Sequence, residues 1–443
     1  MSMIGVISHK VIDYIRGTSV VQDIKNIEKE CSQSLKFLEK VQLERLINLL
    51  IFAKNYTPFY RENTDLKYIP ENDIRKKCYE VIKSLPIITK EIIHNNYEMF
   101  KSQKNFRHAK SQTGGSTGQP LSYLIDMTSV SRTRAFDLFM WNKDFGYKLG
   151  DKVLVIGGSS IGGKNSLPLK IYNFLQFKKF VEGGFLSQDS VDKNLKTILY
   201  GRYDAIYAYP SSLAEYVLRA KELGYTFKGN IKGIAVTSEN LLENTRLLLE
   251  QFFNAPVFSV YGARDGGIVA DECIAKNGFH LNYLDCYVET QKFEDTGYIN
   301  ELVITNLQSY SMPFIRYRVG DFGDIDYKPC SCGLPLPKVV NLYGRSRDIL
   351  LFPNGTRIHG SVFNKIILKY HVISQYQIIF NRKKNEVLVI IKTFDHYASD
   401  ENLIMRLHSD LRAIIPSEIS IYIDSNGVFR YTEAGKLKVL IQE

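Results

Sequence analysis

Residues 231–262 read IKGIAVTSENLLENTRLLLEQFFNAPVFSVYG, and this segment predicts a strand, a helix and a second strand in direct succession. The apolar runs at its two ends are short enough for buried strands, whereas the apolar positions between them follow helical spacing. Upstream, residues 151–158 (DKVLVIGG) predict a buried strand, and residues 203–225 (YDAIYAYPSSLAEYVLRAKELGY) predict a strand, a turn and a helix. Strands that alternate with helices indicate α/β layering.

The sequence pattern changes on both sides of this central α/β part. Residues 1–100 are mostly helical by their apolar spacing, and strand patterns dominate from residue 280 onward. The residues from Ile349 to the end alternate short strands and helices, as in a small separate α+β domain. Because 443 residues exceed what one hydrophobic core usually supports, at least two domains are expected.

The chain carries a net charge of +10 from 57 basic and 47 acidic residues. Such a charge favours anionic partners such as nucleotides, but the basic residues are scattered, which predicts a solvated surface and no nucleic-acid partner. The six cysteines are too few for a disulfide framework, and the N-terminus has no apolar stretch long enough for a signal peptide or a membrane span. We therefore expect a cytoplasmic protein with reduced thiols and no integral membrane segment.

The first residues, MSMIGVISHKVIDYIRG, predict a helix, because Ile4, Ile7, Val11, Ile12 and Ile15 recur at helical spacing. We expect this helix to pack on the protein. A peripheral contact with a membrane surface is the alternative.

Two glycine-rich segments compete as phosphate-binding loops, because glycine lets backbone N–H groups turn toward an anion. The first, GGSSIGGKN at residues 157–165, nearly fits the P-loop pattern from Gly158, with Gly163 and Lys164 in place. The next position requires a Ser or Thr hydroxyl for Mg²⁺, yet it holds Asn165. A flexible loop at the end of a strand is therefore the favoured interpretation.

The second segment is SQTGGSTGQP at residues 111–120, which is unsuited to a core strand or a helix interior. On composition alone, a phosphate site and a plain Gly/Ser/Thr loop are equally compatible with it. Its hydroxyls and glycines are the candidate phosphate ligands: Thr113, Gly114, Gly115, Ser116, Thr117 and Gly118.

Five motifs follow this loop: YGARD (261–265), NELVITNL (300–307), PFIRYRVGD (313–321), YGRSRD (343–348) and TEAGKLK (432–438). In this order and at these spacings the set resembles the adenylate-forming superfamily of acyl-CoA ligases. It is most similar to the phenylacetate–CoA ligase branch with its capsular-polysaccharide-biosynthesis relatives. The resemblance covers nearly the whole chain and includes AKNYTPFYRE (53–62), SLPIITKE (84–91) and YAYPSSLAEY (207–216).

The resemblance implies a large multi-layer α/β domain at residues 1–345, with a helical part at 1–100. A small mobile α+β domain at 349–443 would follow a hinge at 345–348. It also implies that a carboxylic acid reacts with ATP and Mg²⁺ to give an acyl adenylate and pyrophosphate. The acyl group would then pass to coenzyme A, an acyl carrier protein or an amino sugar of a polysaccharide pathway. The motifs identify neither the acid nor the acceptor, and they leave the oligomeric state open.

Each matched motif implies a role for particular residues. The loop at 111–120 would grip the β- and γ-phosphates, with Ser116 and Thr117 in direct contact. Tyr261, followed by Gly262, would stack on adenine. Asp321 would accept hydrogen bonds from the ribose hydroxyls.

Further roles follow from the remaining motifs. Asp265 would help to hold Mg²⁺, and Arg345 would lie near the ribose and phosphates. Ser238 and Glu239, in VTSEN, would border the nucleotide and the acid. Lys436 would reach from the C-terminal domain to the attacking carboxylate and the α-phosphate, with Lys438 as the alternative if the alignment shifts.

Three residues depart from the family pattern. Asp265 stands where the family usually has Glu, and it is one methylene shorter. Arg264 beside it is atypical, and Arg347 stands at the position of the usual hinge acid. These departures keep a non-catalytic scaffold with the same fold open as an alternative, beside a P-loop hydrolase or kinase.

A separate metal site is predicted from three cysteines and one histidine, which together make a complete tetrahedral zinc set: Cys273, His280, Cys330 and Cys332. Relatives in the same branch have a similar Cys…His…CxCG arrangement. Four protein ligands leave no open position, so we expect a structural Zn²⁺. Cys31, Cys78 and Cys286 are expected to be ordinary side chains.

Overall fold

The computed structural model describes residues 2–113, 121–158, 167–183, 188–263, 265–292, 300–345, 349–367, 369–370, 372–393, 401–431 and 437–443. The chain divides into two compact units. The first unit comprises Met1–Gly150 and Val260–Leu342, and the second comprises Asp151–Ser259 and Tyr343–Glu443. The domain boundaries and the hinge expected from the sequence stay predictions.

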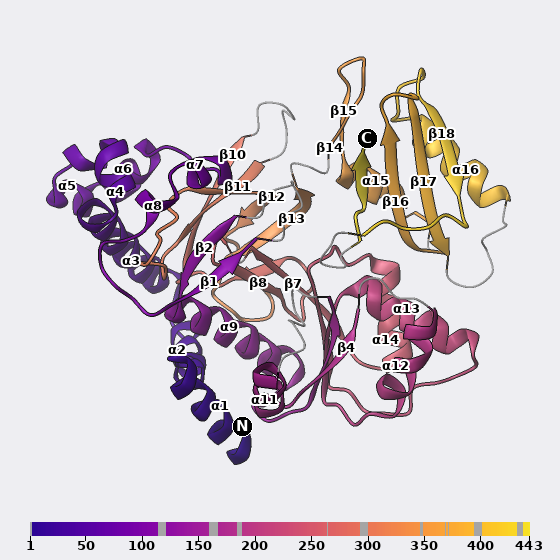
Figure 1. The fold of residues 1–443 in the computed structure, drawn as a ribbon, viewed down its shortest axis with the longest axis horizontal. Helices are drawn as coiled ribbons and strands as arrows, with labels where there is room; N and C mark the ends of the chain where they lie inside the picture. The colour runs from indigo at the N-terminus through magenta and orange to yellow at the C-terminus, as the bar shows by residue number, and fades with distance from the viewer. Residues whose placement is uncertain are drawn as a thin grey trace. The chain divides into compact units, whose positions relative to one another are not determined.

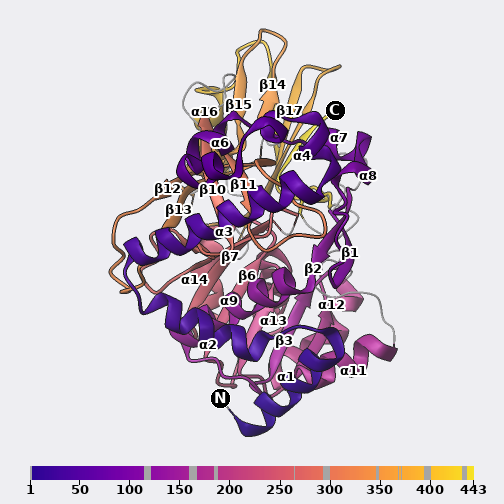
Figure 2. The same ribbon diagram turned by 90° about the vertical axis from the view of Figure 1, so that its left-hand side faces the viewer.

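The N-terminal part of the first unit is helical, as the apolar spacing predicted (Figures 1 and 2). Side-chain caps define several of the helix starts, since the Ser34 and Thr89 hydroxyls accept from backbone N–H groups that have no helical partner. The helical segments are α1 (Met3–Arg16), α2 (Val20–Cys31), α3 (Leu35–Tyr56), α4 (Pro58–Asn63), η1 (Asp65–Tyr68), α5 (Glu71–Lys76), α6 (Cys78–Ser84), α7 (Lys90–Asn95), α8 (Tyr97–Phe100) and α9 (Met127–Phe145).

The strands of the first unit form a largely antiparallel arrangement beside these helices. A hairpin of β1 (His108–Gln112) and β2 (Ser122–Asp126) stands apart from the main sheet. Neighbouring main-sheet strands run in the order β10 (Cys286–Lys292), β11 (Asn300–Asn306), β12 (Tyr317–Asp326), β13 (Lys338–Arg345), β9 (Phe279–Leu281), β8 (Ile268–Glu272) and β7 (Val257–Ala263). The strand-rich pattern from residue 280 onward is thereby confirmed.

The second unit contains the parallel strands that the alternating sequence pattern predicted. Their order is β4 (Lys178–Glu182), β3 (Val153–Gly157), β5 (Ala205–Ala208) and β6 (Gly233–Thr237). Every residue of β3 and β6 is buried, as expected for parallel strands covered on both faces. Their helices are α11 (Leu167–Leu175), α12 (Gln188–Tyr200), α13 (Pro210–Glu222) and α14 (Glu243–Phe253), of which the last three group together in Figure 1. Residues 231–262 thus form β6, α14 and β7, as predicted.

The C-terminal part of the second unit is a small α+β layer. Its sheet order is β18 (Ser420–Asp424), β17 (Glu386–Thr393), β16 (Ile373–Asn381) and β19 (Leu440–Gln442), with α15 (Gly360–Ile367) and α16 (Glu401–Arg412) packed on it. A short hairpin of β14 (Ile349–Leu351) and β15 (Arg357–His359) precedes them. The α/β fold class and the α+β character of this last part are confirmed. None of the helices in the described ranges has the length and apolar character needed to cross a membrane.

Candidate nucleotide site and metal centre

Asp321 and Tyr261 form a hydrogen-bonded pair in the first unit. Asp321 lies in β12 and is only 3% exposed, and the Tyr261 hydroxyl in β7 donates to its Oδ2 at 2.9 Å. Two carboxylate oxygens offer about four acceptor positions, so this bond leaves Asp321 capacity to accept from a ligand. The structure therefore brings together the residues that the sequence placed at the adenine and at the ribose.

Gly262 follows Tyr261 in β7 and presents an open backbone face. Within the described part of the chain, a side-chain carbon added here would meet one atom closer than 4 Å, the Ile268 carbonyl oxygen at 3.7 Å. Protein packing therefore does not require glycine at this position. The open face would let a flat base approach the backbone beside Asp321, so these residues fit a nucleoside.

Asp265 lies just after β7 and is tied to two other segments of the first unit. Its Oδ2 accepts a hydrogen bond from the Tyr317 hydroxyl at 2.7 Å, and Lys90 Nζ lies 3.9 Å from the same oxygen. Lys90 is placed there by Ile88, whose backbone N–H and carbonyl bond to Arg316 and Arg318 around the start of β12. A cation could contact this carboxylate through Oδ1, while Oδ2 is engaged.

Thr113 closes the base of the glycine-rich loop. Its backbone N–H donates to the Leu121 carbonyl and its Oγ1 accepts from the Leu121 N–H, both at 2.9 Å. These bonds extend the β1–β2 hairpin by one pair, so the loop is anchored at both ends. The rest of the proposed phosphate ligands lie outside the described residues: Gly114, Gly115, Ser116, Thr117 and Gly118.

Glu239 joins three segments within the second unit. It follows Ser238, whose backbone has a φ of +75°, a conformation that few residues other than glycine adopt. Its Oε2 accepts from the Ser211 N–H at 3.2 Å, and its Oε1 accepts from the Leu437 N–H at 2.8 Å. Ser211 is in the first turn of α13, where N–H groups lack helical partners and favour a carboxylate.

The contact at Leu437 links the C-terminal motif TEAGKLK to the segment VTSEN, although the two are far apart in sequence. Lys436 itself lies outside the described residues, as do Arg264 and residues 346–348. Arg345 is the last residue of β13.

The four predicted metal ligands lie together in the first unit. Their ligand atoms are all within 4.8 Å of one another. Cys273 Sγ is 3.7 Å from Cys330 Sγ, too far for a disulfide and close to the separation of about 3.8 Å that two Zn–S bonds of ~2.3 Å at a tetrahedral angle give. Cys332 Sγ lies 3.2 Å from His280 Nε2.

The surroundings of these side chains suit a bound metal. His280 Nδ1 donates to the Leu336 carbonyl at 2.9 Å, which leaves Nε2 as the lone-pair nitrogen facing the cysteines. Burial lowers the pKa of His280 to about 4, so the imidazole is in its neutral, metal-binding form at pH 7. Lys338, paired with His280 across β13 and β9, is buried and lies 3.2 Å from Asn277, which in turn contacts Cys330. Its ammonium also lies 3.5 Å from Asp326, so it would offset only part of the net negative charge of three thiolates and one Zn²⁺.

Sequence reasoning missed two contacts of the candidate site. Lys90 belongs to SLPIITKE, which carried the resemblance, but a lysine at the start of a helix gives no local signal of its distant partner Asp265. The bond between the Ser211 N–H and Glu239 could have been suspected from YAYPSS, because proline starts a helix whose first N–H groups attract a carboxylate.

Comparison with known proteins bears on the fold and the relatives of this chain. No family model matches it. A crystal structure of 2-hydroxyisobutyryl-CoA ligase, in the postadenylation state with R3-HIB-AMP, has a TM-score of 0.69 to this chain at 16% identity, over 91% of this chain and 89% of that one. The fold is that of the adenylate-forming CoA ligases.

The sequence relatives of this chain agree with its fold. Protein CapK of Staphylococcus aureus is 24% identical over 440 residues, 95% of this chain and 91% of that protein. The phenylacetate-coenzyme A ligase of Thermus thermophilus is 22% identical over 370 residues, 78% of this chain and 79% of that enzyme. The resemblance to the phenylacetate–CoA ligase branch is confirmed, and the P-loop alternative at Gly158 and Lys164 is not favoured.

Proposed function

We propose that this chain activates a carboxylic acid with ATP and Mg²⁺, forms an acyl adenylate with release of pyrophosphate, and transfers the acyl group to an acceptor. One observation carries this proposal. The chain shares its fold, over 91% of its length, with a CoA ligase solved with an acyl adenylate. The phenylacetate-coenzyme A ligases among its sequence relatives support the same reaction class.

The chemistry explains why the site needs these residue types. A carboxylate that attacks the α-phosphate brings two anions together, so the site has to supply positive charge and N–H donors where charge develops. The loop that Thr113 anchors would hold the departing pyrophosphate, and Asp321 would fix the ribose. Asp265 would contact Mg²⁺ through Oδ1, with Lys90 adding positive charge beside it. Lys436 would stabilise the reacting carboxylate and α-phosphate.

Coenzyme A is the acceptor that the relatives support most directly, since both the sequence and the structural comparisons include CoA ligases. An acyl carrier protein and an amino sugar stay the alternatives that the motif resemblance implies. Supplying each acceptor to the acid-loaded enzyme and measuring AMP release would separate these possibilities.

A panel of carboxylic acids with ATP, Mg²⁺ and hydroxylamine tests the proposed reaction whatever the natural acceptor is. Hydroxylamine converts an acyl adenylate into a hydroxamate, so at least one acid should yield hydroxamate, AMP and pyrophosphate in equal amounts. ADP with inorganic phosphate would instead indicate a hydrolase, and ADP with the phosphate transferred to a substrate would indicate a kinase. A folded protein that shows no ATP turnover with any of the acids would indicate a non-catalytic scaffold.

Asp321→Asn should raise the KM for ATP by about ten- to a hundredfold in the pyrophosphate assay. A hydrogen bond to a charged group contributes about 1.5–3 kcal/mol, and the amide presents one acceptor oxygen in place of two. Asp324→Asn is the matched control, because Asp324 lies in the same strand and accepts only amide hydrogen bonds from Asn300 and Asn341 among its described side-chain partners. Equal effects of the two variants, or no effect of Asp321→Asn, would remove Asp321 from the nucleotide site.

We also propose that the first unit binds one structural Zn²⁺ through Cys273, His280, Cys330 and Cys332. The ion would hold the end of β8, the short strand β9 and the loop before β13 together. Its four protein ligands leave no position for a substrate, so it would act on stability and not on the chemical step.

Protein purified without added metal should contain about one zinc per chain. Cys332→Ser should lose this zinc and lower the melting temperature by roughly 6–12 °C, as expected for a loss of about 3 kcal/mol in a unit of this size. Cys31→Ser is the control, since Cys31 lies at the end of α2 and is not in the cluster. Zinc near zero in the wild type, with no change of melting temperature on chelation, would contradict the proposal.

A further inference from the structure

Helix α1 is fixed to the first unit by contacts on one side. Ser2 caps it and bonds through its N–H and its hydroxyl to the Leu149 carbonyl. Gly5 lies so close to the backbone of Leu149 and Gly150 that no side chain would fit there. At the other end, the buried carboxylate of Asp13 accepts from the N–H groups of Val20 and Val21 at the start of α2. The helix therefore has a defined orientation beside α2 (Figure 1).

The opposite side of α1 is apolar and exposed to solvent. At 100° per residue, six apolar side chains fall within an arc of about 120°. Their exposures run from 45% to 86%, and they are Met3, Ile4, Ile7, Val11, Tyr14 and Ile15. The helix packs on the protein, as expected, but of the five apolar residues named from its spacing only Ile12 is buried. A surface helix normally has the reverse pattern, with polar residues facing water.

The charged groups of α1 that face solvent are positive. Lys10 is exposed and lies about 80° from the centre of the apolar face, at its edge, whereas Arg16 in the last turn lies about 160° from that centre, on the other side of the helix. Arg107, also exposed, donates to the Ile15 carbonyl at the C-terminal end of the helix. The one acidic residue of α1, Asp13, is buried and engaged in hydrogen bonds, so it does not offset this charge.

We propose that this face of α1 docks on the surface of an anionic phospholipid membrane. An apolar stripe flanked by basic residues on a fixed helix is the pattern of helices that lie in the plane of the interface, with the apolar side chains at the acyl boundary and the cations among the lipid phosphates. A second copy of the chain fits less well. A standard protein interface uses about 20–30 residues a side and carries few cations at its centre, whereas this face offers six apolar side chains edged by basic ones.

Cosedimentation of the full chain with lipid vesicles tests this proposal. The wild type should bind vesicles that contain phosphatidylglycerol and phosphatidylcholine, and binding should fall with added salt and with phosphatidylcholine alone. Ile7→Ser/Val11→Ser should lower binding to the anionic vesicles by about ten- to a hundredfold, because each aliphatic side chain buried in an apolar phase favours transfer by roughly tenfold or more. Lys10→Glu should lower binding to anionic vesicles and leave the weak binding to neutral vesicles unchanged.

Val428→Ser is the control, since Val428 is 85% exposed in the second unit and far from α1 in sequence. The fluorescence of the single tryptophan, Trp141, should be the same in all variants, which shows that each has folded. Wild-type binding that is equal on neutral and anionic vesicles, or unchanged in the double variant, would overturn the proposal. So would a wild-type dimer that the double variant dissociates, without any vesicle binding, because the occupant would then be a second copy.

Discussion

Lys436→Ala should lower adenylate formation from acid and ATP by on the order of a hundredfold or more, the scale expected when a charge used only in the transition state is removed. An ammonium between the attacking carboxylate and the α-phosphate would reduce their repulsion as the bond forms. Transfer of the acyl group from a supplied acyl adenylate should continue near the wild-type rate, because that step does not need attack on the α-phosphate.

Lys436 lies outside the described residues, but the two residues that follow it in the second unit have defined contacts. The next residue, Leu437, donates its N–H to Glu239, and Lys438 donates its N–H to the Arg430 carbonyl. The buried Gln377 amide donates to the Arg430 and Lys438 carbonyls, which clamps this part of the chain. The segment that follows Lys436 is therefore held beside VTSEN.

Lys438→Ala is the control that decides the alignment of the C-terminal motif. It should have little effect if Lys436 is the catalytic lysine. If Lys438→Ala loses adenylation and Lys436→Ala does not, the alignment is shifted by two residues. Equal loss of both half-reactions in Lys436→Ala would contradict the separation of roles.

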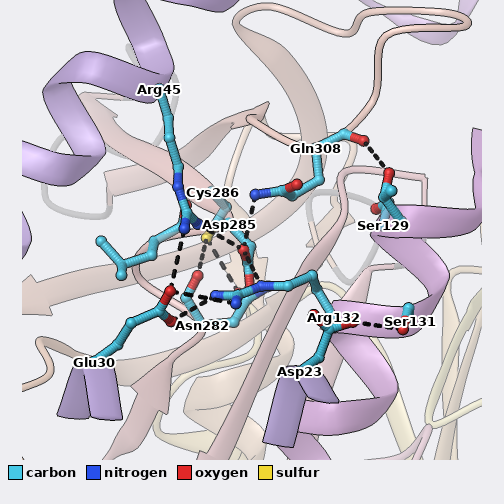
Figure 3. Close-up of polar contacts among 12 residues, drawn as sticks. Asp23, Glu30, Arg45, Ser129, Ser131, Arg132, Asn282, Asp285, Cys286 and Gln308 are labelled. Carbon is cyan, nitrogen blue, oxygen red and sulfur yellow. Dashed lines mark hydrogen bonds and ion pairs between the residues drawn. The ribbon is translucent and has the colours of Figure 1, made fainter. Parts of the chain in front are cut away.

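The second large effect is expected for Asp285→Ala, which should destabilise the first unit. Figure 3 shows the side chains concerned: Arg132 from α9 and Arg45 from α3 converge on Asp285, and both also contact Glu30 from α2. Arg132 Nε lies 2.8 Å from Asp285 Oδ1, and Arg45 Nη1 lies 3.1 Å from the same oxygen. The side chains of Arg132 and Asp285 are only 9% and 5% exposed.

Removing one partner from a buried ion pair leaves the other charge uncompensated, which costs about 3–5 kcal/mol. Asp285→Ala should therefore lower the free energy of unfolding of the first unit by about that amount. Asp285→Ala/Arg132→Met should recover part of the loss, because it also removes a buried guanidinium that Asp285→Ala leaves with Glu30 as its one carboxylate partner among the described contacts. Glu98→Ala, which breaks the exposed pair with Lys101, should change stability by less than about 1 kcal/mol.

Urea unfolding followed by tryptophan fluorescence would measure this difference. The chain has a single tryptophan, Trp141, which is buried in α9 on the same helix as Arg132, so its signal reports on the first unit. A loss below about 1 kcal/mol for Asp285→Ala would show that the network is hydrated or rearranges.

The sequence predicted those features that arise from local pattern. The strand, helix and strand at residues 231–262 follow from apolar periodicity, and the cluster of four proposed metal ligands follows from residue types that few other sites combine. The sequence suggested that the four side chains belong to one site, but it did not show how they meet. Cys273 and Cys330 are distant in sequence and come together because β9 pairs with β13.

Other features were not predictable, because they depend on which surface a segment meets. Periodicity correctly placed a helix at the N-terminus, but it could not tell whether Ile4 and Ile7 face the core or the solvent. Lys90 approaches Asp265 because Ile88 pairs with the start of β12. Glu239 accepts from the N–H of Leu437, which lies 198 residues further along the chain.

Oxygen labelling tests the central claim, the formation of an acyl adenylate, most directly. The accepted carboxylic acid is supplied with ¹⁸O in both carboxylate oxygens, together with ATP, Mg²⁺ and the acceptor, and the released nucleotide is analysed by mass spectrometry. Attack of the carboxylate on the α-phosphorus followed by acyl transfer leaves one acid oxygen on the phosphate, so the AMP should carry one ¹⁸O atom. Unlabelled AMP, or ADP with label in inorganic phosphate, would contradict an acyl adenylate.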